Sequence, residues 1–143
     1  MSILSPKLYA VFLLLGVIRL VNGVEDMSDG KFIPCPKSPN CVSSQSTDQD
    51  HYIDPLRYQG ELAAAKSRLL QVLNGLAGTS VETETDYYIH ATFTSRIFRF
   101  VDDVEFYFDD AAKLIHLKSA SRIGWSDLGA NRRRCEAIRS SFK

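Results

Sequence analysis

Between residues 98 and 121 the chain contains two segments in which apolar and polar residues alternate. Successive side chains of a strand point to opposite faces, so residues two apart share a face. In the first segment, residues 98–108, one face is apolar except for Asp102 and consists otherwise of Phe98, Phe100, Val104, Phe106 and Phe108. In the second, residues 113–121, one face carries Ile115, Leu117, Ser119 and Ser121. The pattern predicts two long strands that cover an aromatic core.

A short hairpin turn through residues 109–112 would join these segments as neighbouring antiparallel strands. Its register sets Phe106 opposite Ile115, Val104 opposite Leu117, and Asp102 opposite Ser119. On the other face it sets Asp103 opposite Lys118 and Glu105 opposite His116, which are pairs of complementary charge. The predicted core face is apolar near the turn and polar at its far end, where Asp102, Ser119 and Ser121 lie together.

Two helices and two further strands complete the predicted domain. Residues 61–76 carry apolar side chains at three- and four-residue intervals and end near two glycines, as a core-facing helix does. Residues 79–85 and 87–94 are typical of strands, and His90 lies on the face that points away from the apolar series, in water or hydrogen-bonded. We expect an α+β fold, with a four-stranded antiparallel meander and two helices packed on one of its faces.

The last helix is predicted to begin near Ser126 or Asp127, because either side chain can accept a hydrogen bond from a free amide of the first turn. Its buried stripe consists of Leu128, Cys135, Ile138 and Phe142. Asn131 and Arg132 fall in the first turns of this helix. They point towards the same end of the sheet as Asp102.

The first 23 residues differ in kind from the rest. Lys7 precedes an apolar run over residues 8–18, and residues 21–23 suit a signal peptidase. We predict a cleaved signal peptide over residues 1–23, with an uncleaved membrane anchor as the alternative. Residues 24–33 are polar without a period and are predicted to be a linker, so that a single domain spans residues 34–143. The protein is therefore expected to be exported, either periplasmic or secreted.

The charges balance, with 17 basic and 17 acidic residues. This balance argues against nucleic acid as a partner and against a polybasic membrane surface. Membrane contact is accordingly expected only through an uncleaved N-terminal segment. Removal of the signal, which carries Lys7 and Arg19, leaves a mature charge of −2.

Two of the three cysteines lie in a proline-rich loop over residues 34–41. Proline excludes helix there, and in an exported protein the thiols of Cys35 and Cys41 are expected to form a disulfide. A redox-active or metal-binding pair is the alternative, but the spacing matches neither kind of motif. Cys135 is expected to be a small buried apolar residue. Nearby Asp48, Asp50 and His51 could ligate a metal, although a solvated loop is favoured.

Three motifs occur in order along the chain: CPKSPNCVSS at residues 35–44, FRFVDDVEF at residues 98–106 and SASRIGWSDLGANR at residues 119–132. In these motifs the chain resembles the domain of unknown function family 1499, over nearly all of its mature length. The motif positions are Cys35, Cys41, Ser95, Arg96, Asp102, Asp103, Glu105, Ser119, Ser121, Arg122, Asp127, Asn131 and Arg132. The resemblance implies domain boundaries and no reaction.

The polar cluster at the end of the sheet allows two non-catalytic hypotheses. In the first, a binding or accessory domain recognises a small anionic ligand or an envelope component, because guanidinium groups suit carboxylate and phosphate oxygens. Its ligand-binding residues would be Arg96, Asp102, Ser119, Ser121, Arg122, Asn131 and Arg132. In the second, the cluster is a buried network that joins the last helix to the sheet. Both require a cationic partner for Asp102, which we predict to be Arg122 or Arg132.

A metal-dependent hydrolase is the third hypothesis, with Asp102, Asp103 and Glu105 as its acidic residues. Strand alternation argues against it, because it places Asp102 on the face opposite to the other two. The sequence also contains no nucleophile motif, phosphate loop or paired-histidine helix. We therefore expect no cofactor and no metal.

Overall fold

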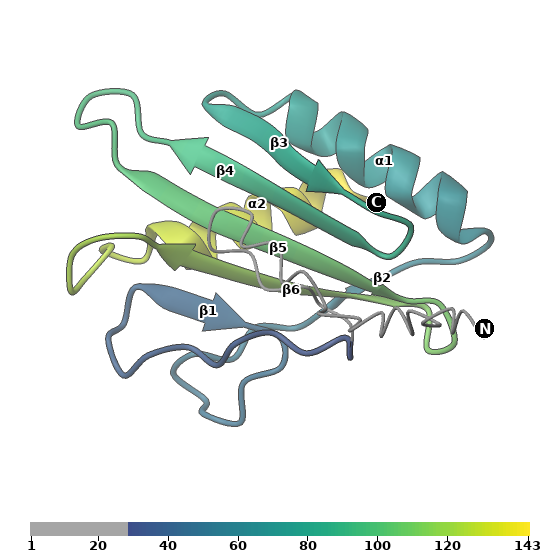
Figure 1. The fold of residues 1–143 in the computed structure, drawn as a ribbon, viewed down its shortest axis with the longest axis horizontal. Helices are drawn as coiled ribbons and strands as arrows, with labels where there is room; N and C mark the ends of the chain where they lie inside the picture. The colour runs from purple at the N-terminus through teal and green to yellow at the C-terminus, as the bar shows by residue number, and fades with distance from the viewer. Residues whose placement is uncertain (1–28) are drawn as a thin grey trace, which may run out of the picture.

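A six-stranded antiparallel sheet organises residues 29–143, the part of the chain that the computed structural model describes (Figure 1). In chain order its elements are β1 (Cys41–Ser43), β2 (Leu56–Arg57), α1 (Leu62–Asn74), β3 (Thr79–Glu84), β4 (Tyr88–Thr94), β5 (Val101–Asp109), β6 (Leu114–Ser121) and α2 (Ala130–Ser141). The predicted signal peptide lies outside the described residues. No helix among residues 29–143 has the length and apolar character needed to cross a bilayer.

The sheet has six strands where the sequence predicts four. Strands β3 to β6 pair with their neighbours in chain order, and β1 and β2 both pair with the far edge of β6. These added strands contain three and two residues. Segments this short show no alternation of their own, so only their pairing with the free edge of β6 defines them as strands.

The register between β5 and β6 differs by two residues from the predicted one. Phe106 lies opposite Leu117, Val104 opposite Ser119, and Asp102 opposite Ser121. The turn therefore spans residues 110–113, where Lys113 adopts a left-handed backbone and the Asp109 carboxylate accepts a hydrogen bond from the Ala112 amide. A shift of two residues leaves each side chain on its predicted face, although it changes the partner opposite.

This register also corrects the predicted outer-face pairs. Glu105 lies opposite Lys118, with 3.6 Å between the carboxylate and the ammonium group, and Asp103 lies opposite Ala120. The outer face is also less exposed than expected, because Tyr88 and His90 are buried there. Tyr88 donates a hydrogen bond to Glu105, and His90 is hydrogen-bonded to Asp103.

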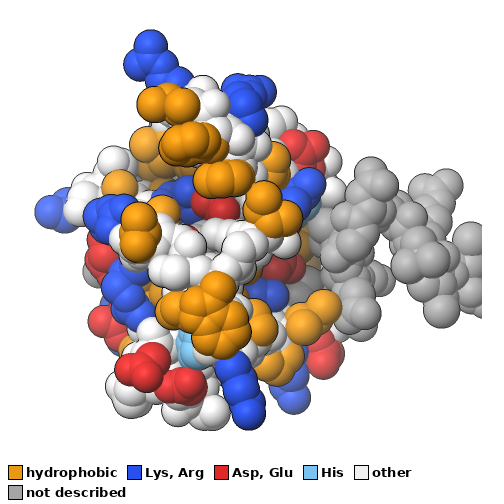
Figure 2. All heavy atoms as spheres, turned by 90° about the vertical axis from the view of Figure 1, so that its left-hand side faces the viewer, with side chains coloured by type: hydrophobic (Ala, Val, Ile, Leu, Met, Phe, Trp, Pro, Cys, Tyr) orange, Lys and Arg blue, Asp and Glu red, His pale blue; other side chains and the backbone are white. Residues whose placement is uncertain are grey.

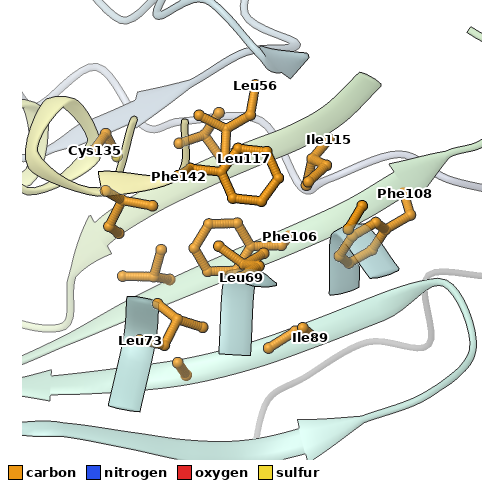
Figure 3. Packing of buried hydrophobic residues seen from close by; sticks show 14 of the residues in the cluster. Leu56, Leu69, Leu73, Ile89, Phe106, Phe108, Ile115, Leu117, Cys135 and Phe142 are labelled. Atoms are coloured by element: carbon orange, nitrogen blue, oxygen red, sulfur yellow. The ribbon is translucent and has the colours of Figure 1, made fainter. Parts of the chain in front are cut away.

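Both helices bury their apolar stripes against the inner face of the sheet in one core (Figure 3). Leu69 and Leu73 of α1 and Phe106 of β5 belong to this core, and all three are fully buried. The predicted positions Cys135 and Ile138 of α2, and Phe142 directly after its last residue, close the core. Full burial of one such large apolar side chain stabilises the fold by about 1.5–3 kcal/mol.

Three residues predicted to lie in the core are exposed instead. Phe98 and Phe100 precede the first residue of β5, in a loop where Arg99 has a left-handed φ of 57°. That conformation breaks the alternation on which their prediction depended. Leu128 precedes α2, which begins only at Ala130, and its own φ of 54° turns it away from the helical stripe.

The proline-rich loop is closed by a disulfide between Cys35 and Cys41, as predicted. Cys41 is buried at the start of β1, so the bond fixes the loop against the sheet. Residues 29–33, which the sequence assigns to a linker, also contact this region: Phe32 is buried, and its amide donates to the Gln45 side chain at 2.8 Å. Cys135 is free and buried, and burial raises the pKa of its thiol to about 12.

We expect simultaneous replacement of Cys35 and Cys41 by alanine to lower the free energy of unfolding by about 2 kcal/mol. The bond closes a loop with a sequence separation of 6, and the chain entropy that it removes from the unfolded state corresponds to about that amount. Urea midpoints of the wild type and the double variant, both under oxidising conditions, measure the difference. Equal midpoints, or three alkylatable thiols in the unfolded wild type, would contradict the prediction.

The loop of residues 44–52, predicted to be solvated, contains a buried histidine that fixes it to neighbouring residues. Nδ1 of His51 lies 2.9 Å from an Asp48 carboxylate oxygen, and Nε2 lies 3.0 Å from the Ser38 carbonyl oxygen. Both ring nitrogens thus face acceptors, and only the protonated imidazolium can donate to both. The Ser38 carbonyl, and after it the Asp48 carboxylate, raise the pKa of His51 above its ordinary value.

We expect the stabilising effect of His51 to increase as the pH falls. A pKa that is higher in the folded state contributes stability that is fully present below the unfolded value of about 6.5 and is lost as the pH rises through the folded value. The difference in unfolding free energy between wild type and His51→Gln should therefore be larger at about pH 6 than at about pH 9. A difference that stays constant with pH would contradict this. Comparison with the variant is needed because burial lowers the pKa of His116, which acts in the opposite direction.

Candidate functional site

A buried ion pair lies at the end of the sheet where the sequence places the polar cluster. Asp102 on the inner face of β5 is 8% exposed, and its Oδ2 accepts a hydrogen bond from Nη2 of Arg134 at 2.6 Å. The guanidinium of Arg134 also lies over the Phe93 ring, 4.7 Å from the centroid. Asp102 therefore has the cationic partner that its burial requires, but this partner is neither Arg122 nor Arg132.

Asn131 of α2 connects this pair to three other parts of the chain. It is fully buried, and its Oδ1 accepts hydrogen bonds from Ser119 and from Arg134, at 2.6 and 2.8 Å. Its Nδ2 donates to the Asn40 carbonyl, to Ser121 and to Asp127. The side chain thus joins the start of α2 to β6 and to the residue before β1.

Asp127 holds the start of α2. Its carboxylate accepts hydrogen bonds from the amides of Gly129 and Asn131 at 2.8 and 2.9 Å. The N-cap residue is Gly129, not Ser126 or Asp127 as predicted, because the helix begins only at Ala130. Burial acts to raise the pKa of Asp127, but the hydrogen bonds from Asn131 and Gly129 outweigh it, and the pKa is lowered. The carboxylate therefore remains ionised at neutral pH.

The three predicted arginines do not converge on Asp102. Arg96 lies exposed in the loop between β4 and β5. Arg122 makes two 2.8 Å hydrogen bonds to Asp103 on the outer face, and Arg132 donates to the carbonyls of Tyr52 and Asp50. The structure thus groups Asp102, Ser119, Ser121 and Asn131, and it leaves the three arginines apart from them.

Sequence reasoning missed Arg134, although a signal for it was present. Residues three apart lie on the same side of a helix, so Arg134 must share a side with Asn131, which was already assigned to the cluster. Cys135, the next residue, was correctly assigned to the core. An arginine beside a core residue needs a buried acceptor, and Asp102 was the carboxylate without a partner.

The acidic residues of the hydrolase hypothesis lie on two faces of β5. Asp102 faces the helices, and Asp103 and Glu105 face the other way, as alternation predicts. Burial acts to raise the pKa of Asp103, but the hydrogen bonds from Arg122 and His90 outweigh it and hold the pKa well below its usual range. Within residues 29–143 no group of three His, Cys, Asp or Glu side chains is placed to hold a metal ion.

A pocket of about 300 Å³ opens directly beside Asp102. It lies between the loop of residues 95–100, the loop of residues 122–129 and the start of α2, and its polar lining consists of Ser95, Asp102, Ser121, Ser126, Asp127 and Arg134. The hydroxyl oxygens of Ser95, Ser121 and Ser126 each accept a hydrogen bond, from Phe100, Asn131 and Leu128. None of these hydroxyls donates to another group among residues 29–143, and in the same range Oδ1 of Asp102 accepts no hydrogen bond.

Large apolar side chains surround this pocket. We call this group the rim; its members are Ile97, Phe98, Phe100, Ile123, Trp125 and Leu128, and they are between 49% and 85% exposed. All six lie in the two loops that meet at one end of the sheet, at the left of Figure 1. Figure 2 looks onto that end and shows apolar side chains spread around a largely polar centre.

A second, larger hollow of about 730 Å³ lies near the disulfide and includes Lys31, Lys37, His51, Tyr107 and His116 in its lining. Its most chemically versatile group, the His51 ring, is bonded at both nitrogens to Asp48 and Ser38. His116 is hydrogen-bonded to Ser44 at 3.2 Å. The His51 ring is therefore not free to bind a ligand in this hollow, and the pocket beside Asp102 is the stronger candidate because it adjoins the buried network of Asp102, Asn131 and Arg134.

Comparison with protein families matches residues 31–142 to the model described as Protein of unknown function (DUF1499). The match spans most of the chain and contains every strand, both helices and the pocket beside Asp102. The chain belongs to this family. The boundaries of the DUF1499 domain agree with the contacts of Phe32, which show that the folded unit begins before Pro34. A search of curated proteins finds no match for the chain.

Proposed function

We propose that this DUF1499 protein is an exported, non-catalytic binding domain whose ligand site is the pocket beside Asp102. The observation that carries the proposal is the set of free hydrogen-bonding groups in that pocket: three serine hydroxyl hydrogens and one carboxylate oxygen, Oδ1 of Asp102. Binding sites typically combine a few such polar groups with apolar walls, which Phe100, Val101 and Ile123 supply here. A volume of about 300 Å³ suits a small group or one end of a larger molecule.

The groups in the pocket favour a neutral, hydroxyl-bearing ligand over the anion expected from the sequence. The one guanidinium in the lining, that of Arg134, already neutralises Asp102, and Asp127 adds a further negative charge. An anion would meet this uncompensated carboxylate, whereas a hydroxyl group can donate to Asp102 and accept from a serine. The ligand class that follows is a small polyol or the hydroxylated end of a larger molecule.

Two features support binding rather than catalysis. The Asp102 carboxylate is engaged in an ion pair with Arg134, which is itself fixed by Asn131, so its position is set by a structural contact. The remaining charged member of the lining, Asp127, is occupied by backbone and side-chain hydrogen bonds at the start of α2. The deeper part of the cluster, around Asn131, thus joins the last helix to the sheet, as the second hypothesis of the sequence analysis expects. It also positions the loops that form the pocket.

Export is supported by the disulfide, because such bonds persist in oxidising compartments. The proposal is consistent with the apolar run at residues 8–18, which precedes the described residues. If the signal is cleaved, N-terminal sequencing of the exported protein should begin near Val24. Recovery of intact Met1 in a membrane fraction would favour the anchor.

The proposed ligand class can be tested by titrating the isotopically labelled domain with glycerol, myo-inositol and glucose, and separately with inorganic phosphate and acetate. We expect at least one polyol to shift the backbone amide resonances of Ser121, Gly124 and Ser126, and Ser126→Ala to weaken that effect. Ser140→Ala, on the exposed side of α2, is the matched control and should change nothing. Shifts at these amides with phosphate or acetate alone would overturn the ligand class, and an absence of shifts with all five compounds would overturn the pocket.

A further inference from the structure

The rim combines exposed apolar side chains with arginines in both loops. Residues 95–100 read SRIFRF and residues 122–129 read RIGWSDLG. Arg122 is paired with Asp103, which leaves Arg96 and Arg99 against the single acidic residue Asp127. Outside these two segments the chain carries 14 basic and 16 acidic residues, because the totals for the whole chain are 17 and 17. Cationic and large apolar groups thus occur together at one end of the sheet (Figure 2).

Two rim-loop residues adopt an unfavourable backbone conformation. Among residues 29–143 only three non-glycine residues have a left-handed backbone, and two of them, Arg99 and Leu128, lie in the rim loops. Such conformations are uncommon for residues with a side chain, and they cluster at sites of binding. Leu128 is 85% exposed, so no burial of its side chain compensates for the strain.

Hydrogen bonds form both loops before any partner arrives. In the first loop the Ser95 amide donates to the Phe100 carbonyl, and the Phe100 amide donates to the Ser95 hydroxyl. Phe98 and Phe100 stack on each other with their ring centroids 5.6 Å apart. At the base of this loop the Thr94 amide donates to the carbonyl of Gly78, where a φ of +78° and the close approach of the Thr94 carbonyl oxygen admit only glycine.

The second loop is equally fixed at its ends. The Arg122 amide donates to the Val101 carbonyl, and Asn40 donates to the carbonyl of Gly124 at 2.7 Å. Before α2, the Leu128 amide donates to the Ser126 hydroxyl, and Arg133 donates to the Leu128 carbonyl. The rim side chains are therefore presented on a rigid support, which reduces the entropy lost on binding.

We propose that the rim docks on a lipid bilayer that carries anionic headgroups, with Phe98, Trp125 and Leu128 inserted at the level of the headgroups. The arginines match the negative charge of such a surface, and tryptophan favours the boundary between headgroups and acyl chains. Ile97, Phe98, Trp125 and Leu128 are at least 69% exposed and do not line the pocket beside Asp102. A fluid bilayer accepts such protrusions, for which a folded protein would need matching cavities. This revises the expectation that only an N-terminal segment contacts the membrane.

The inference depends on Phe98, Trp125, Leu128 and the loop arginines, none of which lines the pocket, so it stands or falls separately from the proposed function. Trp125 is the only tryptophan of the chain and is therefore a specific reporter. Its fluorescence is measured while vesicles of phosphatidylcholine with phosphatidylglycerol, or of phosphatidylcholine alone, are added to the signal-free protein. We expect a shift to shorter wavelengths with the anionic vesicles, and a weaker shift when the salt concentration is raised.

Matched variants locate the contact. We expect Phe98→Ser to lower the vesicle partition coefficient about tenfold and Arg99→Gln to lower it about fivefold. Tyr87→Ser and Arg57→Gln replace exposed residues outside the rim, Tyr87 being at the opposite end of the sheet, and should change it less than about twofold.

Three outcomes would overturn the inference. They are no wavelength shift with either vesicle, an equal loss in Phe98→Ser and Tyr87→Ser, and a lipid-free dimer in sedimentation equilibrium that Phe98→Ser dissociates. The last would mean that the rim binds a second copy of the chain. The polyol titration is carried out without lipid and the vesicle titration without polyol. The proposed ligand site and the proposed membrane contact can therefore be refuted independently.

Discussion

Replacement of Arg134 by glutamine is expected to lower the free energy of unfolding by about 3–5 kcal/mol, the usual cost of breaking a buried ion pair. The variant leaves the Asp102 carboxylate at 8% exposure without its cation, and it removes hydrogen bonds to Asn131 and Ser119. Urea denaturation followed by circular dichroism measures the change.

The neighbouring arginine provides a matched control. Arg133 is exposed and, within the described part of the chain, donates only to the Leu128 carbonyl, so Arg133→Gln should cost less than about 1 kcal/mol. Combining Asp102→Asn with Arg134→Gln should cost less than the sum of the single changes, because the second substitution removes a charge that the first has already left unpaired. Equal urea midpoints for Arg134→Gln and Arg133→Gln would show that the pair does not stabilise the domain.

Replacement of Asn131 by leucine should cost about 3 kcal/mol, although the two side chains have similar shapes. The amide satisfies Ser119, Arg134, Ser121, Asp127 and the Asn40 carbonyl from a fully buried position. Leucine would leave several of these groups buried without partners, and each such group costs about 1–3 kcal/mol, reduced by local rearrangement. The urea midpoint again gives the magnitude, and amide hydrogen exchange in β1 and α2 would locate the loss.

Glu136→Ala tests whether the effect of Asn131 is specific to its position. Glu136 lies exposed on the same helix and pairs with Arg139, three residues further along. Exposed pairs of this kind contribute little, so the change should stay below about 0.5 kcal/mol. An equally small change in the free energy of unfolding for Asn131→Leu would contradict the prediction. It would mean that apolar packing can replace the buried amide and that its hydrogen bonds do not fix the loops around the pocket.

The structure relates two hypotheses that the sequence left as alternatives. The fully satisfied groups, above all Asn131 and Ser119, join α2 to the sheet and face the interior. The serine hydroxyls and Oδ1 of Asp102 lie at the outer edge of the same cluster and have unused hydrogen-bonding capacity among the described residues. Under the proposed function, the inner members of the network would have the structural role and the outer members the binding role.

The sequence alone determined which face of each long strand carries which residues. Alternation placed Val104, Phe106, Ile115 and Leu117 in the core and separated Asp102 from Asp103, and all of these assignments agree with the structure. The disulfide and the stripe of Cys135, Ile138 and Phe142 were predictable for similar reasons. Such features depend on local backbone geometry and on short separations along the chain, both of which are encoded in adjacent residues.

Only the tertiary structure decided which distant groups meet. The pairing of Asp102 with Arg134 depends on how α2 lies across the sheet, and that depends on core packing between elements far apart in the chain. The two-residue change in register followed from a turn whose left-handed residue, Lys113, is not a glycine and gave no signal. Strands β1 and β2 likewise depend on a distant segment, because they exist only through pairing with β6. The exposure of Phe98, Phe100 and Leu128 also depends on tertiary structure, because a residue is buried only when another segment covers it.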